Sequence, residues 1–160
     1  MGFDQYADRY DSWFLANPNV LGSEVLLVKA ALATPGRTLS VGCGSGLFES
    51  ILAREHAVEI KEGIEPSAGM AEIARKRGLD VKIAPAESIP HEDDTFDTVL
   101  MNGIPAYLSD LDGAFAEAFR VLKPGGHLVV ADVPASSAYG LLYQLGALVG
   151  DWQDPRLAKV

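Results

Sequence analysis

A glycine-rich loop is the feature that most constrains this chain. Thr38–Val41 is short and rich in β-branched residues, which predicts a strand. The sequence Gly-Cys-Gly-Ser-Gly follows at residues 42–46, and Leu47–Arg54 then has the pattern of a helix. Glycines between a strand and a helix let the main chain approach a bound molecule more closely than a Cβ permits. The loop therefore indicates a ligand site at the end of this strand.

Strands and helices alternate after the loop. The later predicted strands are one within Ile60–Glu65, then Val81–Ala84, Asp97–Asn102 and His127–Asp132, with helices over Ser67–Arg77 and Asp112–Leu122. Such alternation forms right-handed βαβ units, so we expect a parallel sheet with helices on both faces. Further helices are predicted over Phe3–Phe14, Gly22–Ala33 and Ser137–Val149. We expect a single domain over residues 1–160, with N-terminal helices in 1–35 and the α/β core in 36–150.

Composition excludes several classes of protein. The 160 residues include 13 Lys and Arg against 22 Asp and Glu, a net charge of −9 that provides no basic face for nucleic acid. The run Arg75-Lys76-Arg77 ends a predicted helix, where cations complement the helix dipole. The single cysteine forms no internal disulfide, and no cluster predicts a metal site. No apolar run approaches the roughly 20 residues of a membrane span, so we expect a cytoplasmic protein.

Two familiar nucleotide sites fit the glycine loop poorly. A phosphate-binding P-loop would continue with Lys and Ser or Thr, but Leu47 and Phe48 follow Gly46. A dinucleotide fingerprint would have its third glycine at Leu47, one residue later than Gly46. Glu65 adds a further constraint, because it ends the second strand 19 residues after Gly46. At that place a carboxylate lies beside the loop and accepts both hydroxyls of a ribose.

Five motifs in order carry a family resemblance. They are Val41–Gly46, Glu65-Pro66-Ser67 with Met70, Ala86–Pro90, Phe96–Val99 and Leu122–Leu128. Together they resemble the class I S-adenosylmethionine-dependent methyltransferases, and the branch resembled is similar to the ubiquinone/menaquinone-biosynthesis enzymes. The resemblance covers about residues 6 to 132. It implies a doubly wound, Rossmann-like α/β fold, S-adenosylmethionine as cofactor and a small-molecule acceptor.

The resemblance also implies roles for single residues. The implied cofactor-binding residues are Tyr10, Gly42, Cys43, Gly44, Gly46, Glu65, Pro66, Met70, Ala86, Glu87 and Asn102. The loop glycines with Cys43 would line the methionine portion, and Glu65 would hold the ribose. Ala86 and Glu87 would flank the adenine. Asn102 would lie beneath the transferable methyl, which Tyr10 would cover. Tyr107 and Asp132 lie on the same edge of the sheet, but no catalytic base is assigned.

Two positions depart from the family pattern. An acidic residue that helps to hold the cofactor's amino group usually stands in place of Ser40, and an Asp that accepts from the adenine often stands in place of Pro85. Each lost charge-assisted hydrogen bond is worth about 1.5–3 kcal/mol. Two alternatives therefore stay open beside a methyltransferase. One is an oxidoreductase linked to NAD or another nucleotide, and the other is a non-catalytic module that binds S-adenosylmethionine.

The C-terminal part of the resembled fold is missing from the predicted elements. That fold has seven strands, of which the last two form an antiparallel hairpin beside the fifth, whereas we predict five strands. The fifth strand would then expose an open edge, which is a site for unwanted pairing. We expect a longer natural chain to cover this edge, or a homodimer.

Overall fold

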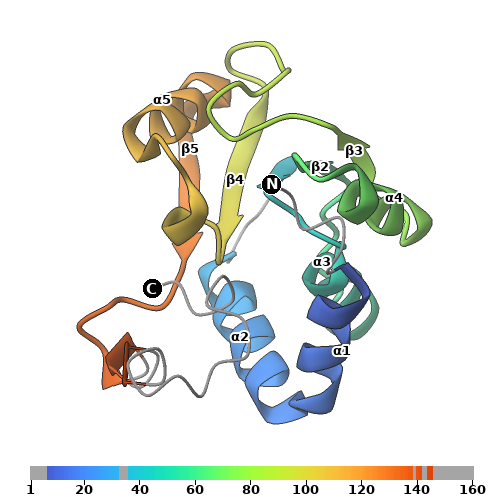
Figure 1. Cartoon of the computed structure of the whole chain (residues 1–160). Helices are drawn as coiled ribbons and strands as arrows, with labels where there is room; N and C mark the ends of the chain where they lie inside the picture. The colour runs from blue at the N-terminus through green and yellow to red at the C-terminus, as the bar shows by residue number, and fades with distance from the viewer. Residues whose placement is uncertain (1–6, 33–35, 139, 142–143, 146–160) are drawn as a thin grey trace.

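In the part of the chain that the structure describes, the sheet has five strands, all parallel, in the order β3-β2-β1-β4-β5 (Figure 1). The computed structural model describes residues 7–32, 36–138, 140–141 and 144–145. The strands are β1 (Thr38–Val41), β2 (Glu62–Ile64), β3 (Asp80–Lys82), β4 (Phe96–Asn102) and β5 (Leu122–Ala131). The order reverses beside β1, so the carboxyl end of β1 lies at the switch point where open α/β sheets bind ligands. The predicted doubly wound, Rossmann-like fold is confirmed.

Helices cover both faces of this sheet. They are α1 (Ala7–Ala16), α2 (Pro18–Ala31), α3 (Leu47–His56), α4 (Ala68–Lys76) and α5 (Leu111–Val121), with a short 3-10 turn, η2 (Pro105–Tyr107). Val99 and Met101 of β4 pack in one buried cluster with α5, whereas Leu100 between them packs with α1, α2 and α3. Because neighbouring residues of a strand point to opposite faces, the two clusters lie on opposite sides of the sheet.

Two predicted boundaries are wrong for identifiable reasons. The second helix was expected to begin at Gly22, but α2 already begins at Pro18, because the first helical position needs no N–H donor. The last strand was expected to begin at His127, but Leu122 already pairs with Phe96. The pairing then shifts register and resumes between Thr98 and His127. The intervening Lys-Pro-Gly-Gly turn is therefore a bulge inside β5.

The free edge of β5 ends the sheet within the described residues. Leu128 and Val130 lie along β5 and are 36% and 44% exposed. Our expectation of a covering segment or a second copy stays a prediction. A helix was expected over Ser137–Val149. Residues 138, 140–141 and 144–145 of it are helical, and residues 139, 142–143 and 146–149 lie outside the described residues. No helix in the described part of the chain is long and apolar enough to cross a membrane.

Candidate functional site

The glycine loop is fixed at the carboxyl ends of β1 and β2. The amides of Gly42 and Cys43 both donate to the carbonyl oxygen of Ile64, at 2.8 and 3.1 Å. The amide of Gly46 donates to the carbonyl oxygen of Cys43 at 2.9 Å, which closes the turn. These bonds hold the loop in one conformation before any ligand arrives.

Gly44 and Gly46 are needed for different reasons. Both have positive φ angles, +55° and +71°, which favour glycine. A Cβ on Gly46 would lie 3.2 Å from the backbone of Ala74, so this glycine allows α4 to pack closely. A Cβ on Gly44 would meet no described atom within 4 Å. The main chain at Gly44 therefore borders open space, as a ligand-binding loop requires.

Glu65 lies beside this loop, where its spacing predicted it. Its Oε2 accepts from the Gly44 amide at 3.0 Å, and its Oε1 accepts from the Ser67 amide at 2.9 Å. Ser67 in turn caps α4, because its hydroxyl accepts from the amide of Met70. The carboxylate is thus held between the glycine loop and the start of α4. Its expected bond to a ribose stays a prediction.

The segment expected to flank an adenine lies between β3 and β4. Ala86 is buried, and the Glu87 carboxylate accepts from the Ser109 hydroxyl at 3.1 Å and from the Asp110 amide at 3.4 Å. Glu87 therefore connects this segment to the start of α5. On its other side, Glu117 of α5 accepts from the Ile89 amide at 2.8 Å. The main chain that follows Ala86 is thus tied to α5 and its start at Glu87 and at Ile89, which suits recognition of a ligand through a backbone amide.

Tyr10 and Asn102 border the same edge of the sheet. Tyr10 of α1 packs edge-to-face on Phe14, with ring centroids 5.1 Å apart. Burial raises the pKa of the Tyr10 hydroxyl, and nearby Glu24, Tyr107, Glu49 and Asp11 raise it further, so Tyr10 stays neutral. Asn102 ends β4 and is partly exposed. Their expected contacts with a cofactor stay predictions.

Three expected cofactor-binding residues, Cys43, Met70 and Pro66, remain to be placed by the surroundings of their side chains. The Cys43 side chain packs among buried residues of α4 and β3, and burial raises the pKa of its thiol. Met70 is buried in α4, whereas Pro66 is exposed. The Cys43 side chain is therefore an apolar filler, and a contact between Cys43 and the cofactor stays a prediction.

Sequence reasoning missed three polar contacts at the site. The Ser45 hydroxyl donates to Asp11 at 2.5 Å, and Arg77 donates to the other Asp11 oxygen at 2.6 Å. These partners are far apart in sequence, so no local pattern indicates them. The Ser40 hydroxyl donates to Glu49 Oε1 at 2.6 Å. The available signal was Glu49 itself, an acidic residue among the apolar positions of α3.

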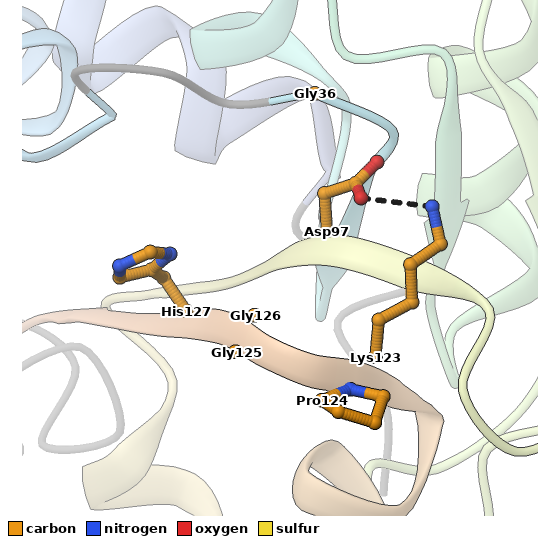
Figure 2. A pocket seen from close by; sticks show the side chains of 7 residues that line it. All are labelled: Gly36, Asp97, Lys123, Pro124, Gly125, Gly126 and His127. Atoms are coloured by element: carbon orange, nitrogen blue, oxygen red, sulfur yellow. Dashed lines mark hydrogen bonds and ion pairs between the residues drawn. The ribbon is translucent and has the colours of Figure 1, made fainter.

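A separate hollow of about 320 Å³ lies at the opposite, amino end of the strands (Figure 2). Asp97 and Lys123 form an ion pair across it at 2.8 Å, and His127 lies at its rim. Gly36 and the bulge of β5 complete its lining. Among the residues that the structure describes, no group of three His, Cys, Asp or Glu side chains could hold a metal ion. Because its lining includes none of the glycine-loop residues, the hollow is distinct from the glycine-loop edge.

Comparisons with known proteins agree on one family. A family model described as a methyltransferase domain matches residues 39–130, more than half of the chain. A crystal structure from Thermotoga maritima, described as an S-adenosylmethionine-dependent methyltransferase and possible histamine N-methyltransferase, is 39% identical with a TM-score of 0.82. That match covers 90% of this chain and 66% of the other.

Two curated relatives extend the comparison. An uncharacterised protein of Methanocaldococcus jannaschii is 36% identical over 89% of this chain and 66% of its own length. A ubiquinone/menaquinone biosynthesis C-methyltransferase of Desulfotalea psychrophila is 30% identical over 81% of this chain and 56% of its own. The chain thus spans about half to two thirds of the length of these relatives. The fold, the motif order and the family match together show that the chain belongs to the class I S-adenosylmethionine-dependent methyltransferases.

Proposed function

We propose that this chain binds S-adenosylmethionine at the carboxyl edge of β1 and β2 and transfers its methyl group to a small-molecule acceptor. The observation that carries the proposal is the contact between Glu65 and the Gly44 amide. It places a buried carboxylate beside main chain that borders open space. A nucleoside with an amino-acid extension suits this arrangement, because it presents ribose hydroxyls to the carboxylate and a thin chain to the glycines.

Each expected residue would contact one part of the cofactor. Glu65 would accept from the ribose hydroxyls, and the Ala86 amide would donate to the adenine. The main chain from Gly42 to Gly46 would line the methionine portion, with Asn102 below the methyl group. The bonds that hold these groups in place, from Ser67 to Glu65 and from Ile89 to Glu117, are already formed. Such preorganisation lowers the cost of binding.

S-adenosylmethionine supplies a methyl group that its sulfonium already activates. The protein therefore has mainly to orient the acceptor and exclude water. Tyr10 is suited to this, because it is neutral and belongs to a helix tied to the glycine loop through Asp11 and Ser45. We propose that Tyr10 covers the methyl group, and that an acceptor enters between Tyr10, Asn102 and Tyr107.

A small acceptor is favoured over a nucleic acid. The net charge of −9 opposes binding to phosphate backbones. Named relatives point the same way: one is a quinone-biosynthesis C-methyltransferase, and another is described as a possible histamine N-methyltransferase. These names leave the acceptor atom open, because a C-methyltransferase methylates carbon and an N-methyltransferase methylates nitrogen.

Calorimetry and a turnover assay test the proposal in sequence. S-adenosylmethionine and NAD are titrated separately into the protein, and we expect heat of binding only from the former. Formation of S-adenosylhomocysteine is then measured with a panel of small amines, phenols, quinols and carboxylic acids. Tight binding of NAD would support the oxidoreductase alternative. Binding of S-adenosylmethionine without turnover on any acceptor would support the non-catalytic module.

A further inference from the structure

Glu49 is a buried carboxylate with an unsatisfied oxygen beside the glycine loop. It belongs to the first turn of α3 and is 3% exposed. Its Oε1 accepts from the Ser40 hydroxyl, whereas its Oε2 is buried without a hydrogen-bond partner among the described residues. Buried polar atoms are nearly always paired, since an unpaired one has lost its bonds to water without replacement, and a charged one loses most. The free oxygen therefore has room for a donor that the described residues do not supply.

A capping role does not account for this side chain. A glutamate three residues after a helix N-cap often accepts from the N-cap amide. Here the N-cap is Gly46, and its amide donates to the Cys43 carbonyl oxygen instead. The dipole of α3 favours an acidic residue in this turn, but it does so equally well for an exposed one.

The charges around Glu49 leave a place for a cation. Arg77 is the basic group that acts on it, but its guanidinium already donates to Asp11 and to the carbonyl oxygen of Ser45. Glu65 is a second acidic group nearby, and Tyr10 and Cys43 are neutral. Among the described residues, no cationic side chain is paired with Glu49. A positively charged ligand group at Oε2 would be attracted by both carboxylates.

We propose that Glu49 binds the α-ammonium group of S-adenosylmethionine through Oε2, with Ser40 fixing the carboxylate through Oε1. The proposal rests on the proposed function, and it explains the departure at Ser40. The carboxylate missing from β1 is supplied by α3, within hydrogen-bond distance of the same position. The methionine end of the site thus still has a carboxylate, which belongs to α3 here and to β1 in the usual family pattern.

The test compares two ligands on matched variants. S-adenosylhomocysteine carries the ammonium group, whereas 5′-methylthioadenosine has the same nucleoside and a thioether but no amino-acid portion. In E49Q we expect the affinity for S-adenosylhomocysteine to fall about 10- to 100-fold, as for a lost charge-assisted hydrogen bond. The affinity for 5′-methylthioadenosine should change less than about twofold. The control is E62Q. Glu62 lies at the amino end of β2, away from the glycine loop, and pairs with Arg37. The E62Q protein should bind both ligands as the parent protein does.

A rescue variant guards against a merely structural effect. In the double variant S40D/E49Q the carboxylate returns to β1, and we expect affinity for S-adenosylhomocysteine to recover at least tenfold over E49Q. Undiminished S-adenosylhomocysteine binding by E49Q, or an equal loss for both ligands, would overturn the proposal. If the parent protein binds 5′-methylthioadenosine and S-adenosylhomocysteine with equal affinity, the proposal also fails, while the adenosine site stands. If the parent protein binds neither ligand, the proposed function itself is wrong.

Discussion

Asp11 joins α1 to the glycine loop through a 2.5 Å hydrogen bond from the Ser45 hydroxyl. Its second oxygen accepts from Arg77, at 2.6 Å, and Arg77 also donates to the Ser45 carbonyl oxygen. Three segments remote in sequence thus meet at one carboxylate that is only 8% exposed. The position of Tyr10, one residue before Asp11, depends on this junction.

Asp11→Ala should therefore destabilise the protein. The substitution leaves the partly buried Arg77 guanidinium and the Ser45 hydroxyl without this acceptor, which should cost about 1–3 kcal/mol. Urea unfolding gives the free energy. The control is Glu72→Gln, which breaks an exposed ion pair with Lys76 on α4 and should have little effect. Equal unfolding midpoints for the two variants would mean that the junction contributes nothing.

Glu65→Ala should weaken binding of S-adenosylmethionine by about one to two powers of ten, because charge-assisted hydrogen bonds to the ribose are lost. Some stability should be lost as well, since Gly44 and Ser67 lose their acceptor. Titration calorimetry measures the affinity, and circular dichroism checks the fold. Glu65→Gln is the matched variant, which keeps the shape but not the charge. Normal affinity in a folded Glu65→Ala protein would remove Glu65 from the site.

Gly44→Val should abolish cofactor binding while leaving most secondary structure in place. The new side chain meets no described atom, so it would occupy the space that the ligand needs. It also strains the backbone, because φ is +55° and a β-branched residue disfavours this region. Gly78→Val separates backbone strain from blocked ligand space. Gly78 also has a positive φ, +98°, and equally open surroundings, but it lies at the end of α4. That variant should lose stability but bind S-adenosylmethionine, and a Gly44→Val protein that still binds would refute the loop's role.

Local signals in the sequence predicted the fold well. The bounds of β1 were predicted correctly because an apolar, β-branched segment is followed at once by glycines. The helix expected over Ser67–Arg77 agrees with α4, whose N-cap is Ser67 and whose C-cap is Arg77, followed by Gly78 with a positive φ. The contact between Glu65 and the loop followed from strand order, since adjacent parallel strands end at the same edge.

Contacts between distant segments could not be predicted in this way. Arg77 was interpreted as complementing the dipole of its helix, but it also pairs with Asp11, 66 residues away. Glu49 is an acidic residue in a surface helix, a type that is almost always exposed, so its burial required the structure. Both contacts depend on how helices pack on the sheet, which residue periodicity does not specify.

The contribution of Glu49 to the stability of the ligand-free protein should fall as pH rises. Burial raises its pKa above the ordinary value of 4.5, and nearby Glu65 raises it further, while the Ser40 hydroxyl and Arg77 lower it. The folded protein therefore holds this proton more tightly than the unfolded chain does. The resulting stabilisation is full below pH 4.5 and is lost as pH rises through the higher pKa of the folded state.

Glu49→Gln isolates this contribution from that of other carboxyl groups. Glu62, Asp97 and Glu117 have pKa values lowered by basic partners, so their stabilisation is present at neutral pH and lost on acidification in both proteins. The free energy of unfolding of Glu49→Gln should exceed that of the parent protein increasingly as pH rises above 4.5, until pH passes the raised pKa of Glu49 in the folded protein. Urea titrations across this range measure the difference. With saturating S-adenosylhomocysteine the advantage should shrink or reverse, because the ligand's ammonium group stabilises the ionised glutamate. A difference that does not vary with pH would show that Glu49 keeps one protonation state throughout.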